Sequence, residues 1–497
     1  MSILKDINIE RIYSLFSYNV DEPLIFSSGL FLFLFCAFML VYSLIHKNHR
    51  IKVLFVTVFS LYFYYKSSGL YFLIILLTTV VDFSIGHFIY ITKEKWKKYS
   101  LLLMSLIFNI GVLVYFKYTN FFFQMFHDIT QSEFKPFDIF LPIGVSFFTF
   151  QSMSYTIDIY RGKLKPLSNI INYAFYVSFF PQLVAGPIVR ASEFIPQILN
   201  PTRVNKTMIG KGIFLILIGL FKKAVIADYI STNFVARVFE NPALYSGFEN
   251  LIGVYGYALR IYCDFSGYSD MAIGIALLLG YKFNINFNAP YKSKNITEFW
   301  RRWHISLSSW LKDYLYISFG GNRKGKIRTY IHLLLTMLIG GLWHGQSIKF
   351  IFWGALHGLG LIIHKLYQSI FKVDIKSKQF GFIYNCLSWF LTFHFVCFCW
   401  IYFRAQNIEM AHEMIHQIFY SFKWEIAFDF INGYKIVSIL IILGFTTHFL
   451  PAKFDDWCEK MVIKSNWLLQ SIYICIIIIL VIQFKSSDIQ PFIYFQF

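Results

Sequence analysis

Charged residues are scarce in this sequence. Only 14% of its 497 residues are Asp, Glu, Lys or Arg, whereas 57% are hydrophobic. An average soluble domain carries about 25% charged residues. The composition therefore excludes a soluble protein and indicates a chain that crosses a membrane several times.

Cysteine is also sparse and scattered. The 7 cysteines lie in or beside apolar segments, and the closest pair is Cys397 with Cys399. No CxxC pair occurs. This pattern gives little support to a disulfide framework or a zinc knuckle.

The sequence shows no sign of a cleavable signal, an internal repeat or a long linker. Residues 1–22 are mixed and charged, and no small-residue cleavage site follows the first apolar run. We therefore expect one membrane domain over residues 1–497, with residues 1–22 as an extramembrane or interfacial segment.

Acidic residues are outnumbered by basic ones, 27 against 45, and the formal net charge is +18. The basic residues form short clusters between apolar windows, which is typical of topology signals and membrane-surface contacts rather than of nucleic-acid binding. The loops after the first, third and fifth windows are all basic and fall on one side if the N-terminus is outside. The positive-inside rule is then satisfied.

Apolar windows run along most of the chain, and several are shorter than the ~20 residues of a clean span. The sequence predicts an all-α polytopic integral membrane protein with about eleven or twelve transmembrane helices plus interfacial and re-entrant pieces. The windows cover residues 24–45, 51–65, 70–92, 99–126, 138–160, 171–189, 207–229, 246–263, 268–281, 328–343, 347–371, 383–403, 434–450 and 468–484.

Two polar interruptions predict irregular backbone inside apolar regions. Pro181, Gly186 and Pro187 break the stretch FFPQLVAGPIVR, and Asp264 and Asp270 in CDFSGYSDMAIG interrupt two apolar windows. Irregular backbone at membrane depth requires protein or a cavity to cover it, and buried carboxylates require partners or a water-filled route. We infer a cavity within the membrane, although the two aspartates are also suited to bracing helices.

The segment from Trp300 to Ile317 predicts one amphipathic helix at the membrane boundary. Its apolar stripe recurs at steps of three and four: Trp300, Trp303, Leu307, Trp310, Tyr314 and Ile317. The opposite polar face holds Arg301, His304, Ser308 and Lys312. His304 is therefore either a functional group or an ordinary polar-face residue.

His344 has a different setting, at the end of a long apolar run from Tyr330 to Trp343 and beside three glycines. An ionisable ring at membrane depth is a candidate catalytic group, although such a ring can also donate to a backbone carbonyl. His357 and His364 are expected to fill core or lipid-interface positions.

Two other classes of function are also consistent with these sequence patterns. His412, Glu413 and His416 spell HExxH, the helical motif of zinc proteases, although no motif for a third ligand is present and no metal site is expected. Irregular helices around midplane carboxylates also build transport sites, so a glycan transporter or flippase is the other alternative.

Seven stretches in chain order carry a resemblance: PQLVAGPIVR, DFSGYSDMAIG, NFNAPY, EFWRRWHISLSSWLKDYLYI, GGNRKG, GLWHG and FWGALHG. Over residues 135–410 the chain resembles the membrane-bound O-acyltransferase (MBOAT) family, in particular its bacterial alginate O-acetyltransferase (AlgI-like) branch. The resemblance implies a catalytic core over 135–410, C-terminal spans over 411–497 and helices around a central tunnel. His344 matches the family's catalytic histidine, and His304 matches its second functional histidine.

The resemblance also implies an acetyltransferase in the bacterial inner membrane, with acetyl-CoA as the expected donor and no bound cofactor. Acetyl groups would pass from a cytoplasmic thioester to an extracytoplasmic polysaccharide such as alginate, or to a periplasmic acetyltransferase that delivers there. D-alanyl or peptidoglycan acyl transfer is the alternative, and the extra C-terminal spans favour polysaccharide acetylation. Four basic residues are expected to attract donor phosphates if they face the cytoplasm: Arg301, Arg302, Arg323 and Lys324.

Overall fold

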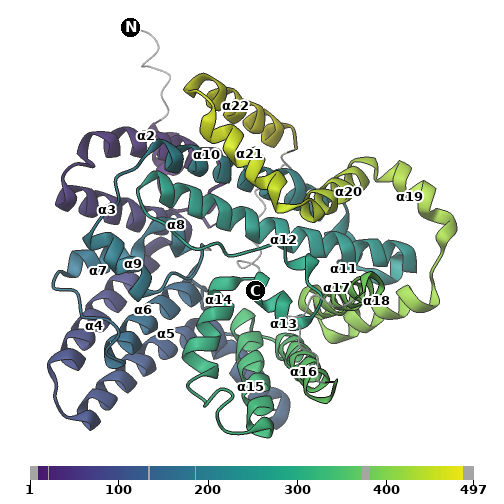
Figure 1. Cartoon of the computed structure of the whole chain (residues 1–497), viewed down its shortest axis with the longest axis horizontal. Coiled ribbons are helices and arrows are strands. Elements are labelled where there is room, and N and C mark those ends of the chain that lie inside the picture. The colour runs from purple at the N-terminus through teal and green to yellow at the C-terminus, as the bar shows by residue number, and fades with distance from the viewer. Residues whose placement is uncertain (1–8, 21, 132–134, 185, 372–380, 485–497) are drawn as a thin grey trace. The chain divides into compact units, whose positions relative to one another are not determined.

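The computed structural model describes residues 9–20, 22–131, 135–184, 186–371 and 381–484. Within these ranges every regular element is a helix and no strand occurs, so the predicted all-α fold is confirmed (Figure 1). The chain divides into two compact units, Met1–Arg203 and Val204–Phe497. Part of the predicted N-terminal segment, residues 1–8 and 21, lies outside the described residues.

The first unit is built from long apolar helices around a small buried polar cluster. On α4 (Phe72–Ile91) the Asp82 carboxylate accepts hydrogen bonds from Ser105 (2.6 Å) and Asn109 (2.8 Å), both on α5 (Lys95–Thr130). These bonds allow a carboxylate to lie among apolar helices. The helices of the unit are α1 (Ile9–Phe16), α2 (Gly29–Ile45), α3 (His49–Ser68), α4 (Phe72–Ile91), α5 (Lys95–Thr130), α6 (Val145–Tyr160), α7 (Ile170–Ser178), α8 (Phe180–Leu183) and α9 (Ala191–Leu199).

The helix break predicted near Pro181 is present. Helix α7 ends at Ser178, and the short α8 follows with Pro181 in its first turn. Proline fits there because the first turn of a helix does not use its N–H groups internally.

The second unit contains the candidate site. Its helices are α10 (Lys206–Leu220), α11 (Ala236–Glu240), α12 (Gly247–Leu278), α13 (Ile296–Arg302), α14 (Ile305–Trp310), α15 (Lys326–His344), α16 (Ile348–Phe371), α17 (Phe382–Arg404), α18 (Ile408–Tyr420), α19 (Ala427–Gly433), α20 (Lys435–Phe449), α21 (Ala452–Lys464) and α22 (Trp467–Phe484). A π-helical segment, Phe221–Asp228, continues from α10, and another, Leu311–Tyr316, continues from α14.

Among the described residues, five helical stretches are long and apolar enough to cross a membrane, and a bent pair of helices would make six. The pair is Trp424–Gly433 with Lys435–Phe449, bent by 101°. Other apolar windows form shorter or broken helices; one example is the window 207–229, which passes from α10 into a π-helical segment. The number of eleven or twelve crossings therefore stays a prediction.

The interruption predicted at CDFSGYSDMAIG is wrong, because α12 runs without a break for 32 residues. Its carboxylates are paired: Asp264 lies 2.6 Å from Lys223 and Asp270 lies 2.8 Å from Lys222. Both lysines come from the π-helical segment that follows α10. Paired charges need no irregular backbone to reach water, so the aspartates brace α12 against that segment.

Helices α15 and α16 lie side by side and bring His344 into the interior of the unit (Figure 1). Gly341 of α15 faces Gly354 of α16, and a side chain at either position would overlap the backbone of the other helix. The close approach of the two backbones holds the end of α15, where His344 is the last helical residue.

Candidate functional site

His304 lies at a break between two helices. Helix α13 ends at Arg302, Trp303 is extended, and His304 adopts a left-handed conformation (φ 42°, ψ 56°) before α14 begins at Ile305. The prediction of one continuous amphipathic helix is therefore wrong. The break turns the imidazole away from the expected polar face, and the residue is fully buried.

Asn286 explains why the chain breaks at this point. Its backbone carbonyl accepts from the N–H of Ile305 (2.9 Å). Its side-chain oxygen accepts from the N–H (3.1 Å) and the hydroxyl (2.9 Å) of Ser306, and lies 3.2 Å from Nδ1 of His304. Its amide nitrogen donates to Ser269 of α12 (3.1 Å). These bonds offset the cost of a left-handed non-glycine residue, which is about 1–2 kcal/mol.

Asn286 was not predicted to be a site residue, although it stands in the motif NFNAPY. The signal available was an amide between two hydrophobic residues, Ile285 and Phe287. A buried amide needs hydrogen-bond partners, but the sequence does not show that those partners are 17 to 20 residues away.

The His304 ring packs among aromatic side chains. Its centroid is 4.5 Å from that of Phe265 on α12, 6.4 Å from that of Phe287 and 6.2 Å from that of Trp343 on α15. Burial lowers the pKa of His304 to about 3, because the charged imidazolium loses its hydration there. The ring is therefore neutral near pH 7.

His344 is buried where three helices meet, with 3% of its surface exposed. Its ring centroid lies 4.9 Å from that of Trp343, its neighbour on α15. It lies 4.9 Å from Trp353 of α16 and 5.3 Å from Phe403 of α17, both nearly perpendicular to it. The three rings restrict the orientation of the imidazole.

Trp343 joins the two histidines, since its ring contacts both His304 and His344. Two residues 40 positions apart in the sequence thus belong to one buried aromatic cluster. The cluster continues through Trp353 to His357, which accepts a hydrogen bond from the indole N–H of Trp300 (3.3 Å). His357 is a core residue, as predicted.

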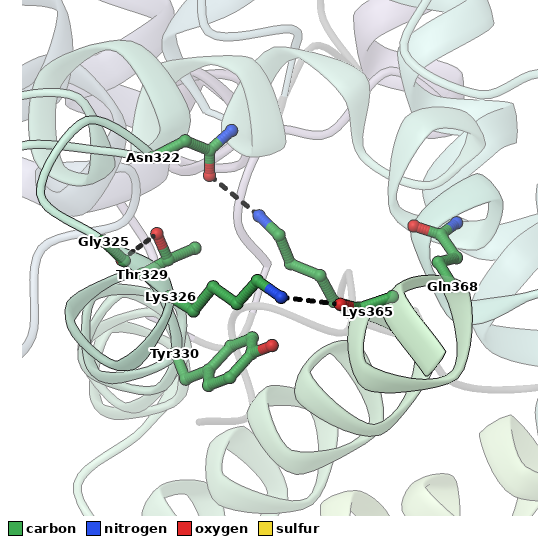
Figure 2. Close-up of a pocket in the computed structure, with 8 residues that line it drawn as sticks. Asn322, Gly325, Lys326, Thr329, Tyr330, Lys365 and Gln368 are labelled. Carbon is green, nitrogen blue, oxygen red and sulfur yellow. Dashed lines mark hydrogen bonds between the residues drawn. The ribbon is translucent and has the colours of Figure 1, made fainter. Parts of the chain in front are cut away.

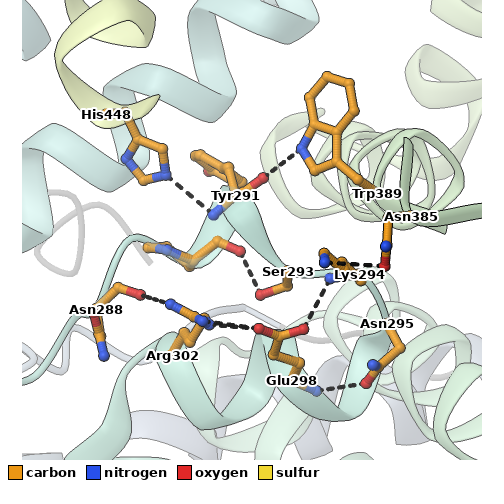
Figure 3. Close-up of polar contacts among 11 residues, drawn as sticks. Asn288, Tyr291, Ser293, Lys294, Asn295, Glu298, Arg302, Asn385, Trp389 and His448 are labelled. Atoms are coloured by element: carbon orange, nitrogen blue, oxygen red, sulfur yellow. Dashed lines mark hydrogen bonds and ion pairs between the residues drawn. The ribbon is translucent and has the colours of Figure 1, made fainter. Parts of the chain in front are cut away.

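The four basic residues expected to meet donor phosphates have different settings. Arg302 donates to Glu298 (2.9 Å) and to the carbonyl of Asn288 (3.1 Å), so it anchors the chain that enters α13 (Figure 3). Arg301 is exposed. Arg323 and Lys324 are exposed in the turn before α15, which contains three glycines with positive φ. These three cations remain accessible to an anion.

The HExxH motif lies on α18, and its two histidines are exposed. Glu413 accepts a hydrogen bond from Gln417 (2.9 Å), while the rings of His412 and His416 contact Tyr402 and Tyr420. Throughout the part of the chain that the structure describes, no three metal-ligating side chains gather in one place.

The chain matches the family model of the membrane-bound O-acyltransferases over residues 96–405. It is 38% identical to the peptidoglycan O-acetyltransferase of Helicobacter pylori, covering 79% of each chain. It is 34% identical to the probable alginate O-acetylase AlgI of Pseudomonas putida, covering 95% of this chain and all of the relative. It is 30% identical to the teichoic acid D-alanyltransferase of Bacillus subtilis, covering 57% of this chain and 73% of the relative.

The matched region contains both histidines, the aromatic cluster and Asn286. The extent of the match to the family model favours acyl transfer over the transporter and zinc-protease alternatives. This chain belongs to the membrane-bound O-acyltransferase family and is a membrane O-acyltransferase.

Proposed function

We propose that this protein transfers acetyl groups from a thioester donor, acetyl-CoA, to hydroxyl groups of an extracytoplasmic polysaccharide at the bacterial inner membrane. The observation that carries the proposal is the meeting of His304 and His344 on either side of Trp343 in one buried cluster. The acceptor is an alginate-like polymer, reached directly or through a periplasmic acetyltransferase.

The extent of similarity supports acetyl rather than D-alanyl transfer. Similarity to the D-alanyltransferase of Bacillus subtilis covers 57% of this chain, whereas similarity to the probable alginate O-acetylase covers 95%. Peptidoglycan remains the second candidate acceptor, because the Helicobacter pylori relative is a peptidoglycan O-acetyltransferase.

His344 is the proposed general base. Its neutral imidazole accepts the proton of the acceptor hydroxyl while the hydroxyl oxygen bonds to the thioester carbonyl carbon. The carbon–sulfur bond then breaks, and the imidazolium returns the proton to the leaving thiolate. Such general-base catalysis contributes about 10²- to 10⁴-fold in rate.

His304 is proposed to orient the acceptor hydroxyl. Asn286 receives two hydrogen bonds from Ser306 on its side-chain oxygen, which fixes the orientation of its amide. That oxygen faces Nδ1 of His304, so Nδ1 carries the proton of the neutral ring. Nε2 is then the acceptor nitrogen, which suits it to a hydroxyl donor rather than to an oxyanion.

Exposed cations would supply the attraction for donor phosphates. Arg301, Arg323 and Lys324 are the stronger candidates, because Arg302 is already paired with Glu298. Their role requires that this surface face the cytoplasm.

The test is His344→Ala expressed in cells that lack the wild-type protein. We expect normal amounts of the protein in the membrane and normal polymer yield, with glycan acetyl content reduced at least 100-fold. His412→Ala, an exposed histidine outside the cluster, is the matched control and should retain full acetylation. An active His344→Ala variant would refute the proposed base, and loss of polymer itself would point to transport.

A further inference from the structure

A pocket lies between the first turns of α15 and the last turns of α16 (Figure 2). Its volume is about 460 Å³. Lys326 and Tyr330 line it from α15, and Lys365, Gln368 and Ser369 line it from α16. Two facing helices thus direct hydrogen-bonding side chains into one space large enough for a small polar group.

The two ammonium groups of the pocket have neutral partners. Lys326 donates to the hydroxyl of Ser369 (3.1 Å), and Lys365 donates to the side-chain oxygen of Asn322 (2.8 Å). Both bonds are visible in Figure 2. Of the ion pairs formed within the described ranges 9–20, 22–131, 135–184, 186–371 and 381–484, none includes either lysine. Two positive charges therefore face the pocket without a carboxylate to balance them.

The surrounding backbone and side chains add to this positive potential. The pocket is next to the N-terminus of α15, a helix of 19 residues that begins after Gly325 without a side-chain cap. The free N–H groups and the dipole of such a helix end favour an anion. Arg323, Lys324 and Arg328 are exposed within three residues of Lys326.

We propose that this pocket binds a phosphate group. A phosphate oxygen would bridge the two ammonium groups, and the Tyr330 hydroxyl and Gln368 amide offer further donors. Along α15, Lys326 is 18 residues from His344, or about 27 Å at 1.5 Å per residue. The pocket is therefore a binding site separate from the histidine cluster.

Two sources of phosphate share this chemistry. One is the nucleotide end of a coenzyme A thioester, whose acyl end would lie far from its phosphates. The other is the headgroup of an anionic lipid, since α15 is mostly apolar from Leu333 to Trp343. The assignment to the donor rests on the proposed function, whereas phosphate binding itself does not.

The first experiment measures binding of adenosine 3′,5′-bisphosphate to the purified full-length protein by calorimetry. This probe carries nucleotide phosphates without the thiol arm. We expect Lys326→Gln/Lys365→Gln to weaken binding at least 10-fold, and Lys326→Arg/Lys365→Arg to retain it within threefold. Lys460→Gln, an exposed lysine on α21, is the matched control and should not change binding.

The second experiment measures retention of phosphatidylglycerol by native mass spectrometry after release from nanodiscs of defined composition. Loss of retained lipid in the double Gln variant, with no nucleotide binding in the wild type, would identify the lipid as the source. Unchanged nucleotide binding and unchanged lipid retention in that variant would overturn the proposal. His344→Ala should keep both kinds of binding, so failure of the catalytic proposal is distinguishable from failure of this one.

Discussion

The two histidines of the site reach the same aromatic cluster by different structural routes. His344 ends a regular helix, and its position follows from an apolar run that stops at a glycine. His304 stands between two short helices in a left-handed conformation, held by contacts with Asn286. The setting of His344 depends on its neighbours in the sequence, whereas the setting of His304 depends on a loop that lies 18 residues upstream.

This difference shows how an amphipathic pattern can mislead. A strict helix from Trp300 to Ile317 would place His304 opposite the tryptophan stripe. One left-handed residue after Trp303 changes the register of everything that follows. Trp303, His304 and Leu307 are then all buried, although helical periodicity would place His304 on the face opposite Trp303 and Leu307.

The largest effect is expected when both histidines are removed. His304→Ala/His344→Ala should reduce acetyl transfer by about 10²- to 10⁴-fold, within threefold of His344→Ala alone, because residues that act as a unit are not additive. The measurement compares the rates of acetyl transfer by membranes that contain equal amounts of each variant. A double variant whose loss is the product of the two single losses would mean that the histidines act separately.

The next largest effect is expected from Asn286→Ala, which removes the contact that orients His304. We expect kcat to fall about 10-fold with little change in KM, because substrate binding would survive while orientation is lost. Asn288→Ala is the matched control: its side chain is exposed, and it binds Arg302 through its backbone N–H and carbonyl, which the substitution keeps.

The Asn286→Asp variant tests whether Asn286 acts by positioning His304 or only by supporting the local structure. The carboxylate keeps an acceptor for Ser306 and places a negative charge beside His304, which should raise the pKa of the imidazole. Activity should then recover at alkaline pH and fall at acidic pH, where the ring becomes protonated. A pH profile parallel to that of the wild type would contradict a role for Asn286 through His304.

A smaller effect is expected at the turn that follows His344. An added methyl group in Gly345→Ala would overlap the ring of Phe350, so we expect a loss of about 1–3 kcal/mol in stability and a partial loss of activity. Thermal unfolding of the purified protein measures the loss of stability. Gly433→Ala, where the added carbon meets open space, should be neutral; equal losses in both variants would contradict the packing argument.

The smallest effect concerns pH and stability. The pKa of His304 is lowered by burial from its ordinary value of 6.5 to about 3. Its contribution to stability is therefore complete above pH 6.5 and is lost progressively as the pH falls toward 3, because the unfolded state binds the proton more readily. Between pH 7.5 and 5, the melting temperature of His304→Gln should decrease less than that of the wild type. Equal decreases would contradict the burial argument.

Much of the fold could be predicted because the positions of many helices follow from the local amino-acid composition. Long apolar windows gave the helices α5, α16, α17 and α22, and Pro181 marked a real break. The break assigned to Asp264 and Asp270 failed for a physical reason. Whether a carboxylate interrupts a helix depends on its partners, and Lys222 and Lys223 lie more than 40 residues away in the sequence.

The sequence alone determined that this chain is an all-α membrane protein, and its motifs singled out His304 and His344. Hydrophobicity and short motifs are local properties, so they can be read without coordinates. Only the tertiary structure decided that His304 is buried, that Asn286 holds it, and that Trp343 contacts both rings. These features arise from contacts between distant segments, and such contacts depend on how the helices pack.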